Sequence, residues 1–403
     1  MSTWKAKFAS ILFACGLWHS CSSKQEFDAP DVLLISMESA SVNDWGFADK
    51  AHLLGELAGR GTVFSQAIAG ANWSLPSHFQ MFTGLPPILH GIQEADMRLD
   101  PARSTIAELL LAGQYDTVGF HSAPELSKGH GLEDGFASYA SSVQVSDFLK
   151  KEGSSDKPLF LFVQVKDQQP GLAIAKLLQH VESRGKLDNT LLILTAGCGA
   201  AGTERTKTRS FDDQRLRVPL LIVPPKNASI SIDRHRHEQV SLSDILPTIL
   251  DYTRVGDATE CFGRSLRGPM EGGKARSKPL ISSRVNVVED EELGRGRQLI
   301  DCMRLPGEKL IRRWVRHEGE DGAQLQNIEY YNLKKDPAEE RPLANFGNKR
   351  VREAWGRFER EMDLVRFTHR TMKHSPPENP LFAKRLGYAP IAPATLSGKK
   401  GSK

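Results

Sequence analysis

Apolar and polar positions follow two patterns along residues 28–255. Continuous apolar runs rich in branched side chains indicate strands that are buried on both faces. These runs are residues 31–37, 158–165, 191–195 and 219–223, with a shorter candidate at 117–120. Helical apolar spacing occurs between them, at residues 49–59, 105–112, 171–183 and 242–252, and Pro247 is expected to kink or restart the last helix. Strands that alternate with helices predict an α/β fold, a mainly parallel sheet with helices on both faces.

The pattern changes after about residue 256. Short strand-like pieces separated by glycines and charged turns predict a small antiparallel sheet, at residues 280–288, 298–305, 309–317 and 329–333. Residues 348–368 then predict one amphipathic helix. We therefore expect an α/β domain over 28–255, a C-terminal part with a small antiparallel sheet and a helix over 256–370, and an extended tail over 371–403.

The first 24 residues have the order of charged, apolar and small polar regions that is typical of a secretory signal. The apolar run, residues 8–18, is too short to span a bilayer as a helix. Cys15 and Cys21 are both candidate lipid-attachment sites, and an ordinary cleaved signal peptide is the alternative. The prediction is an exported protein, periplasmic or attached to a membrane of the cell envelope through a lipidated N-terminal cysteine.

Charge and cysteine content exclude several classes of protein. The net charge is +4 over 403 residues, and no basic run is interleaved with aromatic residues, so we expect no nucleic-acid partner. After the N-terminal segment only Cys198, Cys261 and Cys302 remain, with no CxxC and no Cys/His cluster at zinc-ligand spacing. This excludes a disulfide scaffold.

Ligands of a doubly wound sheet bind beyond the carboxyl ends of its strands, so the segments after Met37, Gly70, Val165 and Thr195 are the candidate site. Together these segments resemble the sulfatase family of the alkaline-phosphatase superfamily. The resemblance is collinear over nearly the whole chain and includes residues 31–46 (DVLLISMESASVNDWG), 59–84 (GRGTVFSQAIAGANWSLPSHFQMFTG), 187–199 and 330–345 (YYNLKKDPAEERPLAN). It implies metal-assisted attack on a sulfate or phosphate ester, with Ca or Zn as the divalent cation if the protein is active.

The resemblance places Glu38 where the family has an aspartate ligand for the metal. Ser39 follows at a position that often holds Asp or Thr, and Asn43 replaces another common Asp. Glutamate is one methylene longer and would displace the ion, because hard cations need converging oxygen ligands. Glu38 and Ser39 are therefore either a remnant of the metal site or part of a polar loop without an ion.

The segment from Ser74 to His78 (SLPSH) has the spacing of the family's C/S-x-P-S-R motif. The resemblance therefore places Ser74 at the nucleophile position, at the expected N-terminus of a helix, where backbone N–H groups favour an anion. His78 replaces the arginine that supports formylglycine in the family, so a plain hydroxyl is the expected nucleophile. The structural alternative is that Ser74 is only an N-cap and Pro76 a first-turn proline.

Two further strand ends depart from the family pattern. Gln169 falls on a family histidine; it can hydrogen-bond a sulfate but cannot act as an acid. Gly197 and Cys198 stand where the family has S-D-H-G-E, and they offer only a missing side chain and a soft thiol. Glu204, Asp212 and Asp213 lie downstream and could compensate, although residues 211–213 match a segment that is structural in the family.

Lys309 matches a family lysine that contacts the sulfate, whereas His90 and His121 are expected to be solvated or core-edge residues. The first hypothesis is an exported sulfatase-family protein with weak or no sulfuric ester hydrolase activity. It would keep an anion-binding cleft around Ser74, His78 and Lys309 for a sulfated or phosphorylated ester or glycan. The alternative is an active hydrolase or transferase that uses Ser74 as nucleophile and an altered divalent metal site with Glu38.

Overall fold

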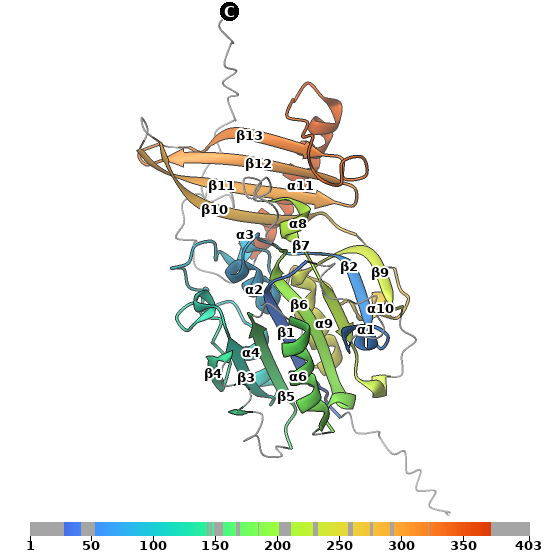
Figure 1. Cartoon of the computed structure of the whole chain (residues 1–403). Helices are drawn as coiled ribbons and strands as arrows, with labels where there is room; N and C mark the ends of the chain where they lie inside the picture. Colours follow the sequence, from blue (N-terminus) through green and yellow to red (C-terminus); the bar gives the residue numbers. More distant parts are fainter. Residues whose placement is uncertain are drawn as a thin grey trace, which may run out of the picture.

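The computed structural model describes residues 28–41, 53–142, 145, 147–148, 156–166, 170–183, 185–200, 211–228, 233–256, 261–274, 277–290, 294–320 and 322–371. These residues form two β-sheets, and helices pack against them (Figure 1). The expected signal segment, both of its cysteines and the tail beyond residue 371 lie outside the described residues. Within the described ranges no helix is both long and apolar enough to cross a membrane.

The larger sheet has nine strands in the order β4-β3-β5-β1-β6-β8-β2-β7, with β9 paired to β2. The strands are β1 (Asp31–Ser39), β2 (Thr62–Ile68), β3 (Asp116–His121), β4 (Ser138–Ser141), β5 (Leu159–Val165), β6 (Thr190–Cys198), β7 (Arg217–Val218), β8 (Leu220–Val223) and β9 (His235–Ser241). The central strand β1 pairs in parallel with β5 and β6, and β3 pairs in parallel with β4 and β5. Only β7 and β8 run antiparallel to their neighbours. The predicted mainly parallel sheet is therefore confirmed.

The helices of this part form two groups (Figure 1). Their bounds are α1 (Leu53–Ala58), α2 (Ser74–Thr83), α3 (Pro87–His90), α4 (Ile106–Ala112), α6 (Pro170–Ser183), α8 (Asp213–Leu216), α9 (Ile245–Thr253) and α10 (Arg267–Met270). Helix α1 contacts α6, whereas α2 contacts α4 and α9. Pro247 restarts the predicted helix 242–252: a 3-10 turn, Leu242–Asp244, precedes α9, and the proline falls in the first turn of α9, where its missing N–H is not needed.

The second sheet is antiparallel, in the order β10-β11-β12-β13, as predicted. Its strands are β10 (Leu280–Asp290), β11 (Gly294–Leu305), β12 (Glu308–His317) and β13 (Gln324–Tyr331), and the predicted helix is α11 (Lys349–Thr371). One face of this sheet packs with α11 and α3 in an apolar cluster that includes Leu299, Trp314 and Phe358. The other face packs on the larger sheet, where Ile300 and Cys302 of β11 share an apolar cluster with Ile68 of β2. The two sheets therefore share a buried boundary.

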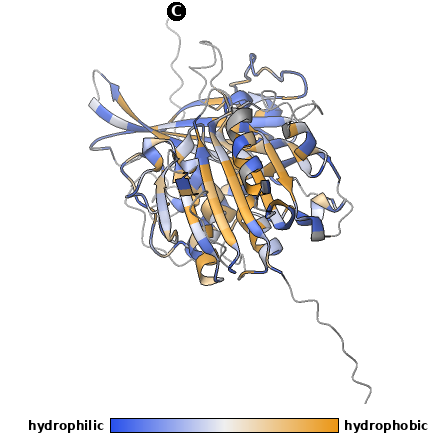
Figure 2. Cartoon of the chain, turned by 60° about the horizontal axis from the view of Figure 1, so that its bottom comes forward, coloured by the Kyte–Doolittle hydropathy of each residue, from blue (hydrophilic) through white to orange (hydrophobic). Residues whose placement is uncertain are grey.

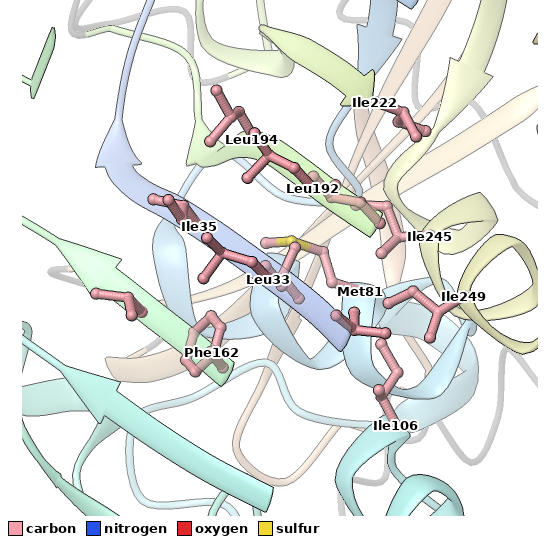
Figure 3. Packing of buried hydrophobic residues seen from close by; sticks show 14 of the residues in the cluster. Leu33, Ile35, Met81, Ile106, Phe162, Leu192, Leu194, Ile222, Ile245 and Ile249 are labelled. Carbon is pink, nitrogen blue, oxygen red and sulfur yellow. The ribbon is translucent and has the colours of Figure 1, made fainter. Parts of the chain in front are cut away.

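Helix α2 lies at the centre of the main core. All ten of its residues are buried. Met81 lies among Leu33 and Leu192 from the strands and Ile245 and Ile249 from α9 (Figure 3). Figure 2 shows that apolar residues concentrate on the strands of the larger sheet. Because α2 is completely buried, its first turn is held at the carboxyl ends of the strands, where the candidate residues meet.

Candidate active site

The carboxyl ends of β1 and β6 lie side by side. Their parallel register pairs Ser39 with Cys198. The Cys198 carbonyl accepts from the Ala40 N–H at 3.0 Å, and the Cys198 thiol donates to the Glu38 carbonyl at 3.5 Å. The structure thus brings together Glu38, Ser39 and Cys198, three of the residues singled out in the sequence, from segments that are 160 positions apart. Gln169, Asn43 and Glu204 lie outside the described residues.

Ser74 is the first residue of α2 and is only 4% exposed. The N-cap residue is Trp73, with extended backbone and no side-chain cap, so the interpretation of Ser74 as the N-cap is wrong. The Ser77 hydroxyl is not free to cap, because it donates to the Ala71 and Trp73 carbonyls. An α-helix leaves its first N–H groups without intrahelical partners. The N-terminus of α2 therefore keeps donors that suit an anion.

His78 lies one turn after Ser74 and is fully buried. Its Nδ1 lies 2.8 Å from the Ser74 carbonyl oxygen and 3.1 Å from the Ser74 Oγ. Because a carbonyl oxygen only accepts, this geometry assigns the ring hydrogen to Nδ1. Burial lowers the pKa of His78 to about 4, so the ring is neutral at pH 7. In this tautomer Nδ1 cannot take a proton from Ser74, and Nε2 is buried with no hydrogen-bond partner among the described residues.

Gly197 packs directly against Ser74 and His78. A Cβ at residue 197 would lie 2.8 Å from His78 Cε1, 3.0 Å from Ser74 Oγ and 3.1 Å from His78 Nδ1. Real Cβ atoms are not found that close to a ring atom. The imidazole therefore occupies the space that a side chain at residue 197 would need.

Among the described residues, the donors of Glu38 and Cys198 do not form a site for a divalent cation. Burial raises the pKa of the Cys198 thiol to about 12, so it stays protonated and is a poor ligand. The Glu38 carboxylate pairs with the Lys166 ammonium at 3.2 Å. The described part of the chain contains no group of three His, Cys, Asp or Glu side chains placed to hold a metal ion. These residues do not fit the Ca or Zn that the family implies.

Lys309 occupies a buried ion cluster. Its ammonium pairs with Asp213 at 2.7 Å and Glu339 at 2.6 Å and donates to the Phe211 carbonyl at 2.9 Å. These three acceptors use all three donors of the ammonium. The placement does not fit the sulfate-contacting role expected from the resemblance. It does fit the structural role expected for residues 211–213, and Asp212 caps α8 by accepting from the Arg215 N–H at 3.0 Å.

His90 and His121 have structural partners. His90 is 4% exposed; its Nε2 donates to the Pro76 carbonyl at 3.0 Å and its Nδ1 accepts from the Ile92 N–H at 3.1 Å. Burial is the main cause that lowers the pKa of His90 to about 3. His90 thus holds the first turn of α2 in place. His121 stacks on Tyr139 at 5.1 Å between ring centroids.

Sequence reasoning missed two arginines near the N-terminus of α2. Arg284, on β10, donates to the Asn72 Oδ1 at 3.1 Å and its guanidinium lies 5.7 Å from the centre of the Trp73 ring. Arg215, on α8, lies close enough to lower the pKa of Cys198 by its charge, against the larger effect of burial. An apolar pattern cannot place Arg284 here, because Asn72 and Arg284 are 212 positions apart.

Solved structures with the same architecture include hydrolases of sulfate and phosphonate esters. A 2-O GAG sulfatase has a TM-score of 0.67 at 16% identity, covering 91% of this chain and 98% of its own. A phosphonate monoester hydrolase of Agrobacterium radiobacter has a TM-score of 0.62 at 16% identity, covering 84% and 96%. A protein solved with its substrate, D-glucosamine-2-N,6-O-disulfate, has a TM-score of 0.64 at 14% identity, covering 85% and 98%. The TM-scores and coverages show a shared fold.

No curated protein matches this sequence. The sequence model of the Sulfatase family does match, at residues 30–164 and 172–255, which is more than half of the chain. The match includes β1, β6 and the whole of α2, so it covers the strand ends described above. The chain therefore belongs to the sulfatase family, within the alkaline-phosphatase superfamily.

Proposed function

We propose that this protein binds sulfate or phosphate esters, sulfated glycans above all, at the N-terminus of α2, and that it hydrolyses them weakly or not at all. The observation that carries the proposal is the contact of Gly197 with His78 and Ser74. Glycine supplies no side chain at this position, where the resemblance places a metal ligand of the family. It leaves in place a buried Ser74 and an uncapped helix N-terminus, which suit an oxyanion.

Hydrolysis needs an activated nucleophile, and the described residues supply little activation. A serine hydroxyl is a weak nucleophile unless a base or a metal ion assists it. The neutral His78 ring directs its Nδ1–H toward the Ser74 carbonyl and hydroxyl, so it is not arranged as that base. Glu38, the candidate carboxylate at the end of β1, is paired with Lys166.

The neighbours in structure support the class of ligand. One is a GAG sulfatase and another was solved with a disulfated glucosamine. By this similarity the proposed ligand is a sulfated or phosphorylated sugar. We also propose export to the cell envelope, with or without a lipid on Cys15 or Cys21, because residues 1–24 have the order of a secretory signal.

The alternative is a hydrolase or transferase that uses Ser74 as nucleophile and an altered divalent metal site with Glu38. One observation favours it: Ser74 Oγ lies at the helix N-terminus, 3.1 Å from His78 Nδ1. This alternative requires the other ring tautomer and an ion. Turnover that depends on Ser74 separates the two proposals.

Calorimetric titration of the purified protein with D-glucosamine-2-N,6-O-disulfate, in EDTA, tests binding. Unsulfated D-glucosamine is the matched control ligand. Binding of the disulfate alone supports the proposal, and equal binding of both sugars, or of neither, overturns it. Turnover of 4-nitrophenyl sulfate and 4-nitrophenyl phosphate is then assayed with added Ca or Zn. Turnover that Ser74→Ala abolishes would establish the alternative.

A further inference from the structure

The C-terminal sheet reaches the N-terminus of α2 through its edge strand β10. The Ser282 hydroxyl donates to the Ala69 carbonyl at 2.9 Å, and the Ser283 N–H donates to the Gly70 carbonyl at 2.9 Å. These contacts hold β10 against the loop between β2 and α2. Side chains two apart on a strand point to the same face. Arg284 therefore follows Ser282 toward this loop, where it bonds to Asn72 and lies near Trp73.

Arg215 reaches the same loop from α8, because the neighbouring Leu216 carbonyl accepts from the Ala69 N–H at 2.7 Å. The Gly199 N–H donates to the Arg215 carbonyl at 2.7 Å, which fixes α8 against the end of β6. A Cβ at Gly199 would lie 1.9 Å from the Gln214 carbonyl oxygen, so only glycine permits this close approach. The Arg215 side chain is half-buried, and its Nε is buried without a hydrogen-bond partner among the described residues.

These two arginines differ from the other half-buried or buried arginines around them. Arg304 and Arg312 each pair with a buried or half-buried aspartate, at 2.7 Å and 2.9 Å. Neither Arg215 nor Arg284 forms an ion pair with any of the described residues within 4.0 Å. Burial, and then the charge of Arg215, lower the pKa of Arg284. Two like charges held near one another, with no carboxylate among the described residues to pair with them, are unfavourable, and a bound anion would relieve that cost.

We propose that Arg215 and Arg284 form a metal-independent clamp for the terminal sulfate or phosphate group of the ligand, beside the first turn of α2. The proposal rests on the proposed function and names the groups that recognise the anion. The two guanidiniums supply the positive charge that a divalent ion supplies to an ester in metal-assisted catalysis. Planar guanidiniums suit the oxygens of a tetrahedral anion, because each can donate two parallel hydrogen bonds.

The test is titration of inorganic sulfate and inorganic phosphate, in EDTA, into the native protein, Arg215→Gln, Arg284→Gln and Arg284→Lys. Arg267→Gln is the matched control, since Arg267 on α10 is also half-buried but pairs with Asp251 and Glu271. Each glutamine variant is expected to bind the anions at least about tenfold more weakly, as expected for loss of a hydrogen bond to a charged group. Arg284→Lys keeps the charge and should recover part of the affinity.

The outcomes separate this inference from the proposed function. The glutamine variants are first shown by circular dichroism to be folded. If they bind the sulfated sugar as tightly as the native protein does, the clamp is wrong and the proposed function stands. If the native protein binds neither the sugar nor the ions, both fail. If the affinity for phosphate rises over that for sulfate as phosphate loses its second proton, the natural ligand is a phosphate ester. If the relative affinity does not change with pH, the natural ligand is a sulfate ester. Equal weakening in Arg267→Gln would overturn the clamp.

Discussion

The Cα of Gly197 faces the imidazole of His78 so closely that any Cβ at residue 197 would lie 2.8 Å from the ring atom Cε1. Gly197→Ala is therefore expected to destabilise the protein by about 1–3 kcal/mol through overpacking. In a His78→Ala background the same change should cost less, because the ring is gone. Urea unfolding of the four proteins of this cycle measures the coupling.

Gly268→Ala is the control for this cycle, because a Cβ there has no heavy atom within 4 Å. The arrangement is refuted if Gly197→Ala is tolerated as well as Gly268→Ala.

The same packing governs any attempt to rebuild a metal site. Gly197→Asp with Cys198→His should acquire Zn or Ca only when His78 is also replaced by alanine, because the new aspartate needs the space of the ring. Metal content after dialysis, measured by plasma mass spectrometry, checks this. Stoichiometric metal in the protein that retains His78, or in the native protein, would contradict it.

Stability should fall in mild acid because of His78. Its pKa is about 4 in the folded protein and its ordinary value is 6.5, so between these values the unfolded chain binds more protons. Stability is present above pH 6.5 and is lost as the pH falls toward 4, by about 1.4 kcal/mol per pH unit for one group. Unfolding midpoints from pH 7 to pH 4.5 should show a shallower slope in His78→Gln. Identical slopes in the two proteins would mean that His78 is not buried as a neutral ring.

Lys309 is expected to act on stability and not on anion affinity. Lys309→Met leaves the buried Glu339 without its cation, and Asp213 keeps only Arg304, so the change should cost about 3–5 kcal/mol. The control is Lys226→Met, whose ion pair with Asp188 is 60% and 61% exposed and should matter by less than about 1 kcal/mol. Thermal unfolding and sulfate titration of both variants check this. A stable Lys309→Met variant that no longer binds sulfate would restore the role first expected for this lysine.

Much of the fold is readable from apolar patterning, since β1, β5 and β6 are continuous apolar runs and α4 follows a capping box of Thr105 and Glu108. The strand-end rule also identifies the segments that meet at the site, because parallel strands bring Ser39 and Cys198 into register. The pattern fails where charge partners come from distant segments. Lys309 and Glu339 form an ion pair only in the folded chain, so the apolar pattern gives no sign of it. Arg284 resembles an ordinary polar position of an edge strand until β10 docks on Ala69.

The docking of β10 also sets the length of chain that must be expressed together. The match to the family model ends at residue 255, yet the donors for the Ala69 and Gly70 carbonyls come from Ser282 and Ser283. A fragment cut at residue 255 would contain every residue of the matched motif and still expose these two carbonyls. The segment that matches the family model is therefore shorter than the segment needed to satisfy the backbone of the loop before α2.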